Sequence, residues 1–202
     1  MTSGITGDVT PPPAPTWGAA SGIDEVVEVS RWDFLAGESP SDDSYSRVSD
    51  PGRYRSLHAF ALALLDDLEA EFEVSRDEGL ELAGGMDTGV SVVRAIRLTP
   101  DMEGAASVTV CLTDFPGLMV RFGSSAAVPF PFCGCDACDE LVQDVVESLR
   151  DRVDAVVSGG FAEYAHGEAS FVTVRGSSGP GDPSGTPIMH SAWSPRIETP
   201  PK

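Results

Sequence analysis

The sequence predicts an α+β protein in which an antiparallel sheet of about four to five strands is packed on one face by two helices. Three observations lead to this prediction. An amphipathic helical pattern covers residues 51–72, short alternating runs follow between 72 and 130, and a second amphipathic pattern ends near Ser158. Each helix needs an apolar partner, and the sheet offers one face rich in Val, Ile, Leu and Phe.

The first helix is predicted over residues 51–72. Ser49 or Asp50 can cap its N-terminus, and Pro51 suits its first turn. Apolar residues then recur at helical spacing. They are Tyr54, Leu57, Ala61, Leu64, Leu65, Leu68 and Phe72.

Period-two alternation predicts the strands. The clearest runs are 92–98, 107–113 and 118–122. Residues 114–117 are typical of a hairpin turn between the last two. Residues 72–80 indicate a weaker strand ahead of them, and 126–130 a strand that lies at an edge because Pro129 lacks an N–H donor. Alternation also indicates that each strand buries one face.

The second helix is predicted to begin at Asp136 or Asp139 and to end at Ser158, before two glycines. Its apolar stripe consists of Leu141, Val142, Val145, Val146, Leu149, Val153, Val156 and Val157. We expect residues 161–164 to be irregular or a last helical turn, 171–174 to be a short strand, and Trp193 to dock on the body.

Three regions are predicted. Residues 1–44 form a Pro-, Gly- and acid-rich tail with partial order, residues 45–166 a single α+β domain, and residues 167–202 a Gly-, Ser- and Pro-rich segment. Both terminal regions are expected to be disordered or irregular. Within the tail, residues 23–29 are an edge strand or a docked segment, anchored by Trp32, Phe34 and Leu35.

The charge composition limits the possible partners. The 202 residues include 32 acidic and 13 basic side chains, for a net charge of −19. Such a chain repels phosphate backbones, which argues against nucleic-acid binding and permits a basic protein partner. No apolar run approaches the roughly 18 residues of a membrane span. The N-terminus lacks a secretory pattern, so we expect a cytoplasmic protein whose thiols stay reduced.

Three of the four cysteines lie within six residues, with the spacing C-x-C-x-x-C. Thiolates are soft donors that favour Zn²⁺, and structural zinc takes four ligands. We therefore predict a zinc site made by Cys133, Cys135 and Cys138, with Cys111 as the fourth ligand. His58, His166, His190 or a local carboxylate are alternatives for that fourth position.

Other roles for the cluster stay open. If Asp136 caps the second helix, the helix N-terminus lowers a thiol pKa, and Cys135 with Cys138 can act as a thiol redox sensor or oxidoreductase. The cysteines can also be packing residues without metal. In that case the acidic surface becomes the functional feature, and the protein is an interaction module.

Catalytic motifs are not found. The sequence contains no Ser nucleophile motif, phosphate loop, HExxH or dinucleotide fingerprint, which favours a non-enzymatic protein. Arg47, Arg53 and Arg55 can bind an anion, but pairing with the many nearby acids is the simpler expectation.

Several short strings together resemble a set of uncharacterised actinobacterial proteins of unassigned function. They are 45–48, Asp50-Pro51, Arg53-Tyr54, Leu57-His58, 97–100, 115–118, 154–157 and, as the most specific, Cys-Gly-Cys-Asp-Ala-Cys-Asp-Glu at 133–140. The resemblance covers about residues 45–164. It implies a bacterial, intracellular protein, and it brings no activity, cofactor or catalytic residue.

Overall fold

The computed structural model describes residues 30–32, 37–86, 89–164, 169–173, 176–178 and 185–196. The predictions for residues 23–29, Phe34, Leu35 and His166 lie outside these ranges. Among the described residues, no helix combines the length and the apolar character that crossing a membrane requires.

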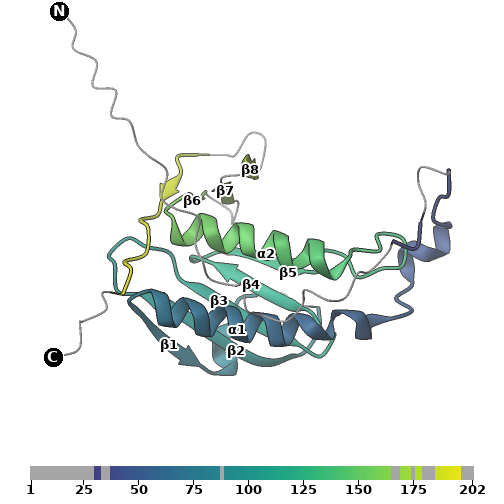
Figure 1. The fold of residues 1–202 in the computed structure, drawn as a ribbon, viewed down its shortest axis with the longest axis horizontal. Helices are drawn as coiled ribbons and strands as arrows, with labels where there is room; N and C mark the ends of the chain where they lie inside the picture. Colours follow the sequence, from purple (N-terminus) through teal and green to yellow (C-terminus); the bar gives the residue numbers. More distant parts are fainter. Residues whose placement is uncertain are drawn as a thin grey trace, which may run out of the picture.

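The elements follow one another along the chain as Figure 1 shows. Two 3₁₀ turns, η2 (Asp42–Ser46) and η3 (Pro51–Arg55), lead into helix α1 (Ser56–Glu71). The first strands are β1 (Val74–Glu78), β2 (Val92–Pro100), β3 (Val108–Thr113), β4 (Leu118–Phe122) and β5 (Ala126–Phe130), with the 3₁₀ turn η4 (Leu80–Ala83) after β1. Helix α2 (Val142–Val157) precedes β6 (Phe161–Glu163), β7 (Ala169–Thr173), β8 (Gly176–Ser178) and β9 (Ile188–Met189).

The first five strands form an antiparallel meander in the order β1-β2-β3-β4-β5. Both helices lie on the same face of this sheet (Figure 1). In the middle of that face, Val110 pairs with Ile96 on β2 and with Val120 on β4. The buried residues of α1 and α2 pack onto them in one hydrophobic core. The predicted α+β fold is confirmed.

The second face of the sheet is also covered, so the expectation of one buried face is wrong for β3. All six residues of β3 are buried. A second, smaller core forms around Cys111, Ala95 and Met119. The partly buried residues packed against it are Leu82, Ala83, Met86 and Val92, three of which belong to η4 or its flank. The segment between β1 and β2 therefore closes this face.

Helix α2 begins at Val142 and not at the predicted Asp136 or Asp139. Its N-cap, Leu141, is extended and makes no side-chain capping bond. Asp139 has φ 44°, a left-handed conformation that interrupts the helical path. The carboxylates of both aspartates accept hydrogen bonds from distant segments, which removes them from capping.

A second sheet, in the order β8-β7-β6-β9, follows α2. Residues 161–164 are therefore not irregular as predicted, because Phe161–Glu163 pairs with both β7 and β9. The strand predicted at 171–174 is confirmed over residues 171–173, which belong to β7, and Val174 lies outside the described residues. Phe161 also contacts Phe122 and Phe171, which joins the two sheets in one core.

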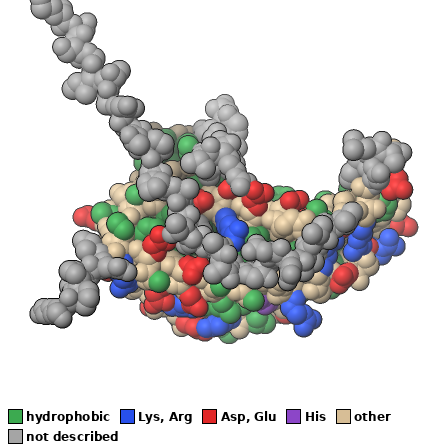
Figure 2. Space-filling view, in the orientation of Figure 1, with side chains coloured by type: hydrophobic (Ala, Val, Ile, Leu, Met, Phe, Trp, Pro, Cys, Tyr) green, Lys and Arg blue, Asp and Glu red, His purple; other side chains and the backbone are tan. Residues whose placement is uncertain are grey.

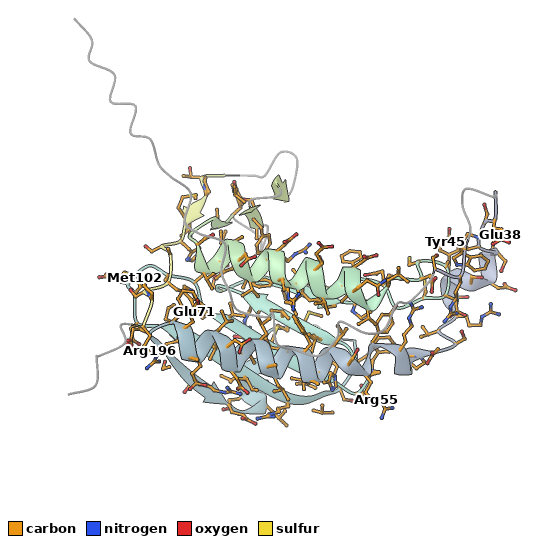
Figure 3. All side chains as sticks on the ribbon, in the orientation of Figure 1. Glu38, Tyr45, Arg55, Glu71, Met102 and Arg196 are labelled. Atoms are coloured by element: carbon orange, nitrogen blue, oxygen red, sulfur yellow. The ribbon has the colours of Figure 1, made fainter. Side chains whose placement is uncertain are left out.

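Trp193 docks on the body, as predicted. It is buried, and its Nε1 donates a hydrogen bond of 2.9 Å to the carbonyl oxygen of Ala106. Its ring meets the edge of Phe72 at 5.7 Å. Nearby, the Arg196 N–H donates to the Glu71 carbonyl oxygen over 2.7 Å, and both residues lie at the same end of the molecule (Figure 3).

The division of the chain into three regions, with boundaries at 44/45 and 166/167, stays a prediction.

Glu163 joins the two sheets through polar contacts. Its side chain is 5% exposed. It accepts hydrogen bonds from the backbone and hydroxyl groups of Ser124 and Ser125, and His190 Nε2 lies 2.9 Å from Oε2. Burial raises the pKa of Glu163, but the bonds from Ser125 and Ser124 outweigh burial and leave that pKa below its ordinary value.

We expect Glu163→Gln to lower the free energy of unfolding by about 2 kcal/mol at neutral pH, since a buried carboxylate loses charge-assisted hydrogen bonds. The depressed pKa of Glu163 means that this stabilisation is present above the unfolded-state pKa of about 4.3 and is lost as the pH falls through the folded-state value. Urea denaturation across pH 3–7 measures it. The exposed Glu103→Gln is the control. A constant difference between wild type and Glu163→Gln down to pH 3 would contradict this assignment.

Candidate metal centre

The loop between β5 and α2, residues 132–140, carries the three clustered cysteines, and we call it the cysteine loop. It lies beside the segment that joins η2 to η3. The Asp136 N–H donates to the Arg47 carbonyl oxygen over 2.8 Å, and the Ala137 N–H donates to the Ser44 carbonyl oxygen over 3.1 Å. Figure 3 labels Tyr45 in η2 and Arg55 at the end of η3, which mark this end of the molecule.

Asp136 anchors the cysteine loop to segments that precede α1. Its side chain is 5% exposed. The carboxylate accepts hydrogen bonds of 2.9 Å from Arg31 Nη1, from Arg47 Nε and from both the N–H and the hydroxyl of Ser49. The bonds from Ser49 and Arg47 hold the pKa of Asp136 well below its usual range. The carboxylate therefore stays ionised and fixed in place.

Asp139 makes a second anchor of the same kind. It accepts hydrogen bonds from the Arg31 N–H over 2.6 Å and from Arg53 Nη1 over 2.5 Å. Arg31 Nε lies 3.2 Å from the same carboxylate, so one arginine contacts both aspartates. Burial raises the pKa of Asp139, but the bonds from Arg31 and Arg53 outweigh burial and lower that pKa. Arg47 and Arg53 pair with acids as expected, but their partners Asp136 and Asp139 lie 89 and 86 positions away along the chain and are not the nearby acids that were predicted.

Glu140 closes the cysteine loop on itself. Its Oε2 accepts a hydrogen bond from the Phe132 N–H over 3.0 Å, and its Oε1 accepts one from the Cys133 N–H over 2.5 Å. Its carbonyl oxygen accepts a bond of 2.9 Å from the Tyr54 hydroxyl. The predicted contact of Trp32 with the body is confirmed, since its Nε1 donates to the Asp136 carbonyl oxygen over 2.9 Å. All three acidic side chains of the loop thus serve to hold its backbone.

The three thiols lie together on this anchored loop. The Sγ atoms of Cys133, Cys135 and Cys138 are all within 4.8 Å of one another, and those of Cys133 and Cys135 are 3.2 Å apart. The Cys138 N–H donates to Cys135 Sγ over 3.4 Å. Cys135 is buried, Cys133 is half-buried and Cys138 is exposed.

The environment separates the pKa values of two of these thiols. Burial raises the pKa of Cys135, but hydrogen bonds, first from the Cys138 N–H and then from the Cys133 thiol, outweigh burial and lower that pKa. Contacts with the sulfurs of Cys135 and Cys133, followed by burial, raise the pKa of Cys138 to about 12. Without a cation, the cluster therefore disfavours a charge on its most exposed thiol.

Of the predicted fourth ligands that the structure describes, Cys111, His58 and His190 do not join the three cysteines, and His166 lies outside the described residues. Cys111 is buried in the core on the other face of the sheet, and burial raises its pKa. His58 Nε2 lies 3.1 Å from the Gly117 carbonyl oxygen, and His190 contacts Glu163. Among the described residues, the metal-ligating group at this site consists of the three clustered cysteines.

Arg31 is the site residue that sequence analysis missed. It lies more than 100 positions from the aspartates that it contacts, inside a region predicted as a tail. No periodicity or spacing in the sequence marks it. Sequence analysis considered the acids of the loop as a helix cap or as a fourth ligand, whereas the structure pairs Asp136 and Asp139 with Arg31, Arg47 and Arg53.

Comparison with known proteins identifies the family of the chain. Residues 24–196 match the model of a family of unknown function (DUF6226), and the chain belongs to that family. This membership confirms the expected resemblance to proteins of unassigned function, while an actinobacterial origin stays a prediction. No curated protein and no solved structure matches the chain.

We expect Asp139→Asn to lower the free energy of unfolding by about 2 kcal/mol, because the substitution removes charge-assisted hydrogen bonds from Arg31 and Arg53. Denaturant unfolding of metal-free protein at pH 7 measures this change. Asp101→Asn, at an exposed aspartate of the β2–β3 connection, is the matched control and should change stability by less than about 0.5 kcal/mol. Equal effects of the two substitutions would show that Asp139 is not an anchor.

Proposed function

We propose that this member of a family of unknown function holds one zinc ion on Cys133, Cys135 and Cys138, and that the ion has a structural, non-enzymatic role. The observation that carries the proposal is the convergence of the three sulfur atoms within 4.8 Å of one another. The bound ion would lock the cysteine loop between strand β5 and helix α2.

The spacing of the sulfurs suits a shared ion. Zinc–sulfur bonds of about 2.3 Å in a tetrahedron place neighbouring sulfurs about 3.8 Å apart. The distance between Cys133 Sγ and Cys135 Sγ is 3.2 Å, and the remaining distances stay within 4.8 Å. Changes of about 1 Å or less in the distances between the sulfurs would therefore complete a zinc–thiolate geometry.

The chemistry of the donors favours zinc over a harder ion. Mg²⁺ and Ca²⁺ prefer oxygen ligands, whereas thiolates select Zn²⁺ and other soft ions. The carboxylates nearest in sequence, those of Asp136, Asp139 and Glu140, already accept hydrogen bonds from guanidinium and backbone groups. Oxygen ligands are thus engaged elsewhere, and three sulfurs form the donor set.

A divalent ion also relieves the cost of bringing thiolates together. The pKa of Cys138 is raised to about 12 by its sulfur neighbours and by burial. A cation at the centre of the cluster reverses this effect, because a coordinating thiol is deprotonated by the metal. Cytoplasmic location belongs to the same proposal, since reduced thiols are the form that binds zinc.

A redox role is the second candidate, supported by the 3.2 Å between Cys133 Sγ and Cys135 Sγ and by the lowered pKa of Cys135. The cause first predicted for that low pKa is wrong. Helix α2 begins at Val142, so neither Cys135 nor Cys138 lies in its first turn. Hydrogen bonds within the loop replace the helix N-terminus as the cause. Cys135 Sγ is close to the sulfurs of both Cys133 and Cys138, and the pairing of Cys135 with Cys138 stays a prediction.

We expect purified protein to contain about one zinc ion per chain, and chelation to lower its melting temperature, because metal binding stabilises the folded state. Elemental analysis and thermal unfolding with and without chelator measure both effects. Cys138→Ser should reduce zinc binding by at least 10-fold while leaving the fold intact, since Cys138 is exposed.

Cys111→Ser is the matched control, because Cys111 lies in the second core and away from the metal-ligating group. It should retain one zinc ion per chain. Zinc loss in Cys111→Ser together with retention in Cys138→Ser would overturn the assignment. Metal-free protein with two thiols missing from the free-thiol count would instead support the redox role.

A further inference from the structure

We propose that the fourth coordination position of the zinc ion is filled by a thiolate from outside this chain. The inference rests on the zinc site of the preceding section and adds the ligand class that the site would accept. It follows from three features of the described residues, namely the donors that are present, their exposure and the charge beneath them.

The described residues supply three donors at this site, whereas zinc takes four. Within the described part of the chain, the group that can hold a metal ion contains Cys133, Cys135 and Cys138. The predicted fourth donor, Cys111, packs with Ala95 and Met119 on the opposite face of the sheet. The acidic side chains of the loop are engaged with arginines, Ser49 and backbone N–H groups, so none is turned to the metal.

Exposure of the donors increases from one side of the cluster to the other. Cys135 is 8% exposed and forms the base, Cys133 is half-buried, and Cys138 is exposed. The neighbouring Phe132 side chain is 78% exposed. An ion held by these sulfurs would lie at the protein surface with one side open, which is the arrangement of a site that admits an outside ligand.

The local charge tolerates an anionic fourth ligand. Zn²⁺ with three thiolates carries a charge of −1, and a fourth thiolate makes it −2. Beneath the loop, the guanidinium groups of Arg31, Arg47 and Arg53 balance the carboxylates of Asp136, Asp139 and Glu140, so these six side chains add no net negative charge to the metal site. The Glu140 carboxylate is held by two backbone N–H groups. Figure 2 shows arginine side chains at this end of a molecule whose net charge is −19.

A thiolate suits this position better than water. Three thiolates reduce the Lewis acidity of the ion, so a bound water stays a weak nucleophile and is readily displaced by a softer donor. The thiolate can come from a small free thiol or from a cysteine of another polypeptide, including a second copy of this chain. No bond other than metal–ligand bonds is made or broken, and the thiol releases its proton to solvent on binding.

The test uses the full chain loaded with Co²⁺ in place of zinc. Sulfur-to-cobalt charge-transfer absorption reports the number of bound thiolates, and the visible bands report tetrahedral geometry. We expect three-thiolate intensity in the monomer and a rise of about a third on adding 2-mercaptoethanol, as a fourth thiolate joins three. Imidazole and chloride should leave the charge-transfer intensity unchanged. Cys111→Ser should respond as the wild type does.

The outcomes separate this inference from the zinc site itself. Absence of charge-transfer bands would overturn both. Three-thiolate bands that do not change on adding 2-mercaptoethanol would overturn the proposal of a fourth thiolate but not the zinc site. The same conclusion would follow if the visible bands changed with imidazole alone. Four-thiolate intensity that falls to three in Cys111→Ser would also overturn the proposal, because the chain would then supply the fourth donor. A cobalt-loaded dimer with four-thiolate intensity would identify a second copy as the thiol source.

Discussion

Two carboxylates of the cysteine loop, those of Asp136 and Asp139, hold together segments that are far apart in the sequence. They accept hydrogen bonds from Arg31, Arg47 and Arg53, all of which precede helix α1. A carboxylate with as little exposure as these would be costly without a partner, and the arginines remove that cost. Because Arg31 contacts both aspartates, the position of each depends on the other.

This pairing also determines what the cysteines can do. A loop of three thiols and three carboxylates offers many ways to bind a cation. Once Asp136 and Asp139 are held by arginines and Glu140 by backbone N–H groups, the sulfurs remain as the donor set. The acids therefore act on the site indirectly, by fixing the backbone that carries Cys133, Cys135 and Cys138.

The second sheet is also held by a buried carboxylate that accepts hydrogen bonds from a distant segment. There the carboxylate of Glu163 accepts hydrogen bonds from Ser124 and Ser125 and contacts His190. Between the two polar anchors lies the apolar core, in which both helices cover one face of the meander. Segment η4 closes the opposite face over Cys111. The cysteine loop is thus attached to a sheet whose two faces are both packed, a rigid support for a surface site.

The sequence by itself determined the elements that local pattern encodes. The order of the meander strands, the edge position of β5 and helix α1 follow from periodicity and turn residues, which act over a few positions. The helix predicted over 51–72 is α-helical from Ser56 to Glu71, whereas Pro51–Arg55 is a 3₁₀ helix at which Asp50 makes no side-chain capping bond. The C-x-C-x-x-C spacing of Cys133, Cys135 and Cys138 likewise predicted their convergence, since a C-x-x-C turn can present two sulfurs to one ion.

Only the tertiary structure decided the rest. The late start of α2 at Val142, the cover of η4 over Cys111 and the partnership of Arg31 with Asp136 depend on contacts between distant segments. No local pattern encodes such contacts, because an aspartate before a helix looks the same whether it caps the helix or meets an arginine from elsewhere. The prediction of Cys111 as the fourth ligand was wrong for the same reason. Alternation shows which side of its strand Cys111 occupies, but only the tertiary structure shows that this side of the sheet faces η4 and not the cysteine loop.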